Sequence, residues 1–223
     1  GANGLEQRGF FVSGTGVLYL TNGSGHEVTL LERSELHVRG KHNVENALAA
    51  LAIARTSGAG MNNLASALRS YRPGKHRLET AGVYQGVTFI DDSKATNPDA
   101  LCRALDAVQE EGDGARVFLI AGGLDKDLDF ACLKPYLRRN VSKVFLVGEC
   151  REKWVCVCSG TLAYEVCPSF EKAVNRAADA ARPGDVVLLS PGCASQDMFR
   201  DYAERGRTFV ELIKRRFGDG KTG

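Results

Sequence analysis

The chain has 223 residues, of which 43% are hydrophobic, so it is long enough to bury one large core or two smaller ones. Its 29 basic and 27 acidic residues leave a formal net charge of +2, without the strong positive charge typical of nucleic-acid-binding proteins. No segment approaches the roughly 20 apolar residues that a membrane span requires, and no apolar leader is recognisable. We therefore expect a cytoplasmic protein that binds neither nucleic acid nor membrane.

Seven cysteines, an odd number in mainly apolar surroundings, indicate reduced thiols that pack as small hydrophobic side chains. Four of them lie between residues 150 and 167, but their spacing matches no zinc ribbon or finger and no histidine lies near them. The four histidines are scattered along the chain. The sequence therefore predicts no metal site.

The first 35 residues contain short runs of alternating polarity separated by Gly, Ser and Asn. This pattern predicts antiparallel strands near 10–12, 17–20 and 27–31. Ala and Leu at helical spacing then predict a helix over 44–57, followed by a second helix over 62–70. The Pro-Gly pair at 73–74 breaks this periodicity, which indicates a linker between two structural units.

Beyond the linker, apolar runs alternate with helical segments, as in parallel sheets covered by helices. Strands are predicted near 83–91, 116–121, 143–148, 162–166 and 185–190. Helices are predicted near 98–110, 128–139, 150–157, 169–181 and 195–216. The predicted fold class is therefore α/β, with a doubly wound, mostly parallel, Rossmann-like sheet in the C-terminal domain.

Polar side chains follow three of the predicted strands, and the carboxyl ends of parallel strands meet at one edge of a sheet. Lys94 and Thr96 follow the first strand, Lys126 follows the second, and Ser195 follows the last. The lysines offer positive charge and the hydroxyls offer hydrogen-bond donors, while Ser195, as the expected start of the last helix, would add its N-terminal N–H groups. These residues together predict a site for an anionic ligand.

Each of these elements also has a purely structural interpretation. The glycines at 122–123 fit a tight turn, Asp91 and Asp92 fit a turn or a helix cap, and Ser195 fits an N-cap. In the functional interpretation, the same glycines would let the backbone approach a ligand closely. Two lysines and two hydroxyls on three neighbouring strand ends favour the functional interpretation.

Five motifs, in order, resemble those of the Mur ligase family, and the resemblance covers the chain from about Gly40 onward. The runs at 93–97 and 190–195 look like those of the D-glutamate-adding members. The motifs are Gly40-Lys41-His42-Asn43-Val44-Glu45-Asn46-Ala47, His76-Arg77, Asp92-Ser93-Lys94-Ala95-Thr96-Asn97, Gly122-Gly123-Leu124-Asp125-Lys126, and Ser190-Pro191-Gly192-Cys193-Ala194-Ser195 with Asp197, Phe199 and Glu204-Arg205-Gly206.

The resemblance implies an ATP-driven amide synthesis that adds D-glutamate to UDP-N-acetylmuramoyl-L-alanine through an acyl phosphate, in peptidoglycan synthesis. It implies that residues 1–72 are the C-terminal part of the central ATP-binding domain, 73–76 a linker, and 77–223 the C-terminal ligase domain. The family's phosphate loop and Mg²⁺ ligands do not occur in this sequence. We therefore expect the chain alone to be inactive, and the full-length enzyme to be a monomer acting on small molecules.

The resemblance also assigns nucleotide-binding residues. Asn43 and Asn46 resemble the asparagines that hold adenine and neighbouring nucleotide groups. Arg77 and Asp92 resemble residues that the C-terminal domain contributes to the ATP phosphates and ribose. Lys94 resembles the lysine that neutralises charge near the acyl phosphate, so Lys94 and Asp92 are the candidate catalytic residues.

For the amino acid, Thr96, Lys126 and Ser195 resemble the D-glutamate site, and Tyr202 resembles an aromatic wall beside it. Two other interpretations remain open. One is a related muramyl-peptide or folylpolyglutamate-type ligase, which would differ in the amino acid. The other is a non-catalytic nucleotide-binding module.

Overall fold

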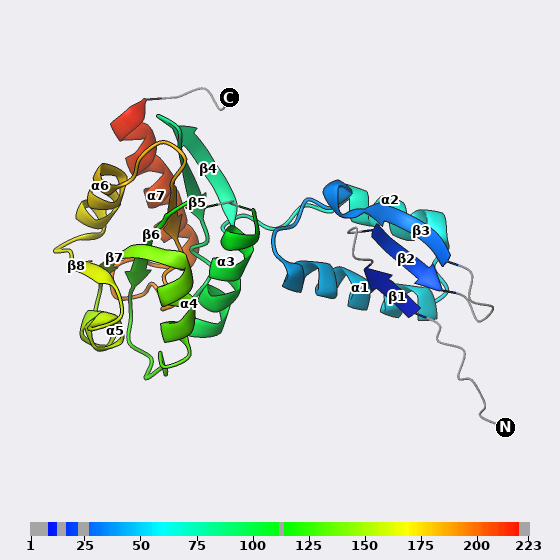
Figure 1. Ribbon diagram of the computed structural model, residues 1–223, viewed down its shortest axis with the longest axis horizontal. Coiled ribbons are helices and arrows are strands. Elements are labelled where there is room, and N and C mark those ends of the chain that lie inside the picture. The colour runs from blue at the N-terminus through cyan, green and yellow to red at the C-terminus, as the bar shows by residue number, and fades with distance from the viewer. Residues whose placement is uncertain (1–8, 13–16, 22–26, 112–113, 219–223) are drawn as a thin grey trace. The chain divides into compact units, whose positions relative to one another are not determined.

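The computed structural model describes residues 9–12, 17–21, 27–111 and 114–218. The chain divides into two compact units, Gly1–Pro73 and Gly74–Gly223 (Figure 1). Within the described ranges, no helix is long and apolar enough to cross a membrane.

The first unit contains a three-stranded antiparallel sheet and two helices. Its strands are β1 (Gly9–Val12), β2 (Val17–Thr21) and β3 (Glu27–Glu32), in the order β1-β2-β3, followed by a 3₁₀ turn, η1 (Arg33–Glu35). The helices are α1 (Lys41–Thr56) and α2 (Met61–Ser70). Apolar side chains of β3, of both helices and of the residue after η1 form a small core, which contains Leu30, Leu31, Leu36, Val44, Leu51 and Leu64. The predicted strands and helices are confirmed, although α1 begins three residues before the predicted start at residue 44.

The second unit is built on a six-stranded sheet in the order β4-β5-β9-β6-β7-β8. Strand β4 is antiparallel to β5, and all other neighbours are parallel. The strands are β4 (Glu79–Tyr84), β5 (Val87–Asp91), β6 (Val117–Gly122), β7 (Val141–Val147), β8 (Ala163–Val166) and β9 (Val186–Leu189). The predicted doubly wound, mostly parallel sheet is confirmed.

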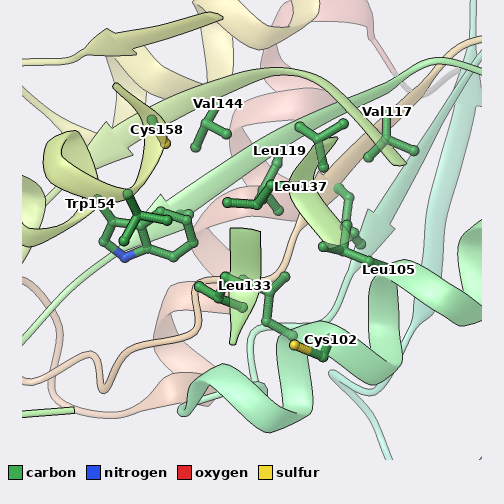
Figure 2. Close-up of a cluster of buried hydrophobic side chains, with 14 of the residues drawn as sticks. Cys102, Leu105, Val117, Leu119, Leu133, Leu137, Val144, Trp154 and Cys158 are labelled. Atoms are coloured by element: carbon green, nitrogen blue, oxygen red, sulfur yellow. The ribbon is translucent and has the colours of Figure 1, made fainter. Parts of the chain in front are cut away.

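Helices cover both faces of this sheet (Figure 1). They are α3 (Pro98–Glu111), α4 (Leu133–Asn140), α5 (Arg151–Cys158), α6 (Phe170–Ala180) and α7 (Tyr202–Phe217). Because successive strand side chains point to opposite faces, Leu119 of β6 packs with α3, α4 and α5, as Figure 2 shows, whereas Phe118 packs with α6 and α7. Both faces of the central strands are therefore dry, which explains their continuous apolar sequences.

The strand predicted over 83–91 is wrong, because this segment is the end of a hairpin. Tyr84 of β4 pairs with Val87 of β5, and the two residues between them, Gln85 and Gly86, both have positive φ. This is the backbone conformation of a two-residue I′ turn. Asn-Gly or Asp-Gly would have indicated such a turn, whereas Gln-Gly gives little signal.

Two helix starts were also predicted too early. Helix α4 begins at Leu133 rather than near 128, and α7 begins at Tyr202 rather than at Ser195. Asp201 is the N-cap of α7, and its carboxylate accepts a hydrogen bond from the N–H of Glu204 at 2.7 Å. The prediction that Ser195 begins the last helix is therefore wrong, and Ser195 does not place helix N-terminal N–H groups beside a ligand.

Candidate functional site

Three loops meet at the carboxyl edge of the second unit's sheet, following β5, β6 and β9. Backbone hydrogen bonds join them: Gly192 donates to the carbonyl of Ala95 (3.0 Å), Gly122 to Pro191 (2.9 Å) and Leu124 to Ala194 (2.9 Å). We call these segments, residues 91–97, 122–127 and 190–195, the rim loops. The prediction that the three strand ends lie at one edge is confirmed.

Two glycines at the end of β6, Gly122 and Gly123, allow the loops to approach one another. Both have positive φ, and a Cβ atom on Gly122 would collide with the carbonyl oxygen of Val147. A Cβ atom on Gly123 would collide with the carbonyl oxygen of Ala194. The space that these glycines leave is therefore filled by neighbouring backbone.

Asp92 is almost completely buried at the first rim loop. Its Oδ2 accepts a hydrogen bond from the hydroxyl of Ser190 at 2.7 Å, and its Oδ1 accepts one from the N–H of Leu78 at 3.2 Å. Burial raises the pKa of Asp92 to about 7, although both hydrogen bonds favour the ionised form. This carboxyl group links β9 and the segment before β4 to the loop that carries Lys94.

The neighbouring Asp91 pairs with His76, which the sequence offered only as part of a motif. His76 Nδ1 lies 2.6 Å from Asp91 Oδ2, and Asp91 Oδ1 accepts a hydrogen bond from the N–H of Ser93 at 2.9 Å. The N–H of Lys94 donates to the carbonyl of His76 at 3.1 Å. The segment preceding β4 is thereby fixed against the first rim loop.

Lys94 and Tyr202 lie together, as a shared ligand site would require. The Lys94 ammonium is 5.0 Å from the centre of the Tyr202 ring, within the range of a cation–π contact. Thr96, two residues further along the same loop, is half-buried. The His76 and Tyr202 rings are nearly perpendicular, with a centroid distance of 6.2 Å.

The hydroxyl of Ser195 is buried and has no hydrogen-bond partner among the residues that the structure describes. A buried hydroxyl without a partner costs free energy, so a ligand or a water molecule is the natural complement. The carbonyl of Ser195 accepts hydrogen bonds from the N–H groups of Met198 and Phe199. These bonds close a turn before α7.

Lys126 is exposed, on a loop that a lysine of α5 holds in place. Lys153 of α5 bridges the carboxylates of Asp125 and Asp127 on either side of it, at 2.9 Å each. The two carboxylates thus share one lysine as their partner. Lys126 remains at the surface as the cation that this loop presents to solvent.

The predicted nucleotide-binding residues are divided between the two units. Asn43 and Asn46 lie at the start of α1 in the first unit, where the amide of Asn46 donates to Oδ1 of Asn43 at 3.3 Å. Arg77 is exposed in the second unit, immediately before β4.

The structure also gathers residues that the sequence did not single out. The ligand atoms of His76, Glu79 and Asp91 lie within 4.8 Å of one another, so one histidine is less isolated than predicted. They bond among themselves, since Glu79 accepts from the N–H of His76 at 2.8 Å and Asp91 accepts from its ring. Elsewhere, the thiols of Cys150 and Cys193 are 2.8 Å apart beneath the rim.

The four cysteines between 150 and 167 do not gather. Cys150 and Cys158 belong to the core on one face of the sheet, Cys167 belongs to the core on the other face, and Cys156 is exposed. A surface pocket between the start of α6 and α7 is lined by Phe170, Phe199 and Leu212, among others, and by none of the predicted site residues.

Comparison with known proteins places the chain in a family. The model of the Mur ligase glutamate ligase domain matches residues 76–193. A UDP-N-acetylmuramoylalanine--D-glutamate ligase of Desulfitobacterium hafniense is 40% identical over 225 residues, covering 96% of this chain and 48% of that protein. The chain belongs to the Mur ligase family. The protein of the same name from Acidobacterium capsulatum is 37% identical over 211 residues, covering 95% of this chain and 45% of that protein.

Solved structures show that this Mur ligase chain shares its fold with more distant proteins. UDP-N-acetylmuramate-alanine ligase of Thermotoga maritima matches with a TM-score of 0.65 at 19% identity, covering 91% of this chain and 44% of that one. E. coli FolC in complex with ADP matches with a TM-score of 0.66 at 21% identity, covering 96% and 48%. The chain spans about half the length of the curated relatives that it matches.

Proposed function

We propose that this chain supplies the amino-acid-binding part of an ATP-dependent ligase that joins D-glutamate to UDP-N-acetylmuramoyl-L-alanine. The supporting observation is that joined rim loops carry Lys94, which contacts Tyr202, and Ser195, whose hydroxyl has no hydrogen-bond partner among the described residues. The chain is 40% identical to a ligase of that name. The assignments of these side chains, and of residues 1–72 to the ATP-binding domain, are part of the proposal.

D-Glutamate carries two carboxylates and the amine that forms the new bond. In the proposed arrangement, the ammonium groups of Lys94 and Lys126 attract the carboxylates, and the hydroxyls of Thr96 and Ser195 donate hydrogen bonds to them. The amine attacks the carboxyl carbon of the acyl phosphate, and the C–O bond to phosphate breaks. The protein contributes orientation and charge stabilisation, without forming a covalent bond.

For the nucleotide, we propose that Asn43, Asn46 and Arg77 contact ATP, with Asp92 beside them. Asp92 is a poor ligand for Mg²⁺, because it is buried, its pKa is raised to about 7, and both its oxygens already accept hydrogen bonds. Asp92 therefore does not fit the role of a Mg²⁺ ligand. We propose that the ligands of that ion lie in the half of the relatives that this chain does not span.

A consequence is that the chain alone should not turn over substrate. We expect no ADP release when ATP, D-glutamate and UDP-N-acetylmuramoyl-L-alanine are added to it. Release of ADP that depends on both other substrates would show that the chain is catalytically complete and would contradict the proposed division of the site.

The proposal is tested by following backbone amide signals of the chain by NMR during titration with D-glutamate. We expect saturable shifts centred on Lys94, Thr96, Lys126 and Ser195, and much weaker shifts with L-glutamate. Lys94→Met should weaken binding about tenfold, since a charged hydrogen bond is lost. Lys134→Met, which removes an exposed lysine of α4, is the matched control and should bind normally.

Other ligands distinguish the alternatives. Stronger binding of meso-diaminopimelate than of D-glutamate would favour another muramyl-peptide ligase. Absence of binding by any of these amino acids at the rim, with the fold intact, would contradict the proposed site.

A further inference from the structure

Arg205 is a fully buried cation beneath the rim loops. It lies in the second turn of α7, and its side chain is 1% exposed. Its guanidinium donates hydrogen bonds to three backbone carbonyls: that of Ser93 at 2.8 Å, that of Cys193 at 3.0 Å and that of Ala194 at 3.3 Å. Its Nε has no partner among the described residues.

Two of these three carbonyls immediately precede predicted site residues. Ser93 is adjacent to Lys94, and Ala194 is adjacent to Ser195. The guanidinium therefore spans the first and third rim loops. It also lies against Gly123 of the second loop, where a Cβ atom would come within 3.2 Å of Arg205 Nη1.

A charged side chain at this position is costly, because burying a cation costs several kcal/mol. The three hydrogen bonds to carbonyls offset part of this cost, and an apolar side chain could not make them. Burial lowers the pKa of Arg205 to about 10, so the group is still cationic at neutral pH. Its planar fork, unlike a lysine ammonium, can satisfy carbonyls from two loops at once.

We propose that Arg205 is a positioning residue that sets the spacing between Lys94 and Ser195. It holds the backbone of both loops from below, so that the ammonium group and the hydroxyl are ready for a dianionic amino acid. This inference rests on the proposed function for the identity of the ligand. The spacing itself is a property of the chain without ligand.

Hydrogen exchange of the chain tests whether the rim loops stay in contact, on which that spacing depends. The N–H of Gly192 bonds to Ala95 and the N–H of Leu124 bonds to Ala194, so both amides report contact between rim loops. In Arg205→Met we expect their exchange to accelerate about tenfold or more, with β6 and β7 core amides unchanged. Arg205→Lys keeps the charge and one hydrogen bond, so it should restore part of the protection.

Arg207→Met is the matched control, since Arg207 is exposed on the same helix and its loss should leave both amides protected. If Arg205→Met does not fold, the exchange of Arg205→Lys tests the proposal instead. Unchanged exchange at Gly192 and Leu124 in Arg205→Lys would overturn the proposal. An equal acceleration throughout β6 and β7 would also overturn it, because it would show a general loss of stability.

Titration with D-glutamate separates this inference from the proposed function. We expect Arg205→Met to weaken binding at least about tenfold and Arg205→Lys to recover part of the loss. If the unaltered chain does not bind D-glutamate but the exchange result holds, the positioning role stands and the proposed ligand is wrong. If binding is normal in Arg205→Met, the positioning role is wrong while the proposed function stands.

Discussion

Adjacent aspartates at the end of β5 have different environments. Asp91 lies against the ring of His76, whereas Asp92 is enclosed by Ser190 and the backbone, and burial raises the pKa of Asp92 to about 7. In the unfolded chain Asp92 releases its proton near its ordinary value of 3.8. Between these two pH values the folded state binds more protons than the unfolded state.

The contribution of Asp92 to the free energy of unfolding of the second unit should therefore fall as pH rises from about 4 to about 7, and then level off. Asp92→Asn should remove this dependence and raise the free energy of unfolding at pH 8 by about 2 kcal/mol. Urea unfolding at pH 5 and pH 8, followed by the fluorescence of Trp154, the only tryptophan, measures both effects.

Asp185 provides a control of opposite sign. Hydrogen bonds from Arg116 and from the backbone keep the pKa of Asp185 below its ordinary value despite burial, so its contribution to stability is present at pH 8 and lost in acid. Asp185→Asn should therefore lower stability at pH 8. A loss of stability in Asp92→Asn at pH 8 would contradict the role assigned to burial.

The reactivity of single cysteines tests which side chains are buried in the cores. Cys132 and Cys156 are exposed, and burial raises the pKa of Cys158 and of Cys167 to about 11. In the native chain we expect a maleimide to label the two exposed thiols quickly, and the five buried thiols only after unfolding. Mass spectrometry counts the labels, and Cys132→Ser with Cys156→Ser should abolish the fast phase. A third thiol labelled at a comparable rate would contradict the described packing.

Some residues of the site could be predicted and others could not. Lys94 and Ser195 were placed at one rim because parallel strands end at a common edge, a rule that needs only the strand positions. The role of Arg205 could not be predicted from its motif, because its side chain donates to backbone carbonyls of two different loops, one of them 112 residues away. Sequence spacing does not reveal such bonds. The pairing of His76 with Asp91 depends in the same way on how β4 and β5 fold together.

At the scale of elements, three residues near the start of α7 contact the rim loops or the residues packed against them. Tyr202 faces Lys94, Arg205 holds two loops, and Gly206 lies against His76, Asp91 and Ser93. The capping pair Asp201 and Glu204 fixes where this helix begins. The sequence contains this Asp-x-x-Glu signal, so the helix start could have been predicted from it.

Gly206→Ala tests the packing of this turn. Within a helix, Gly to Ala normally stabilises by up to about 1 kcal/mol. Here a Cβ atom would collide with His76 Nδ1, Asp91 Oδ2 and Ser93 Oγ, so we expect destabilisation by about 2 kcal/mol instead. Urea unfolding measures the change. Gly74→Ala, where a Cβ atom meets open space, is the control, and stabilisation in Gly206→Ala would contradict the described packing.

At the scale of the whole molecule, the chain consists of two units with separate cores. The segment 71–75 between them is exposed, and the core of the second unit is formed entirely by residues after 74. We expect residues 74–223 expressed alone to fold, with the Trp154 emission and urea midpoint of the full chain. A lower midpoint, or emission typical of exposed tryptophan, would show that the second unit needs the first.

The order of strands has a consequence for biosynthesis. Strand β9 lies between β5 and β6 and is the last strand of the sheet to be translated. Until it leaves the ribosome, β4 with β5 and β6 with β7 and β8 are two separate pieces with apolar edges. The nascent second unit must therefore stay unfinished until nearly its whole length has been made, and during that time it is a natural client for chaperones that cover unpaired strands.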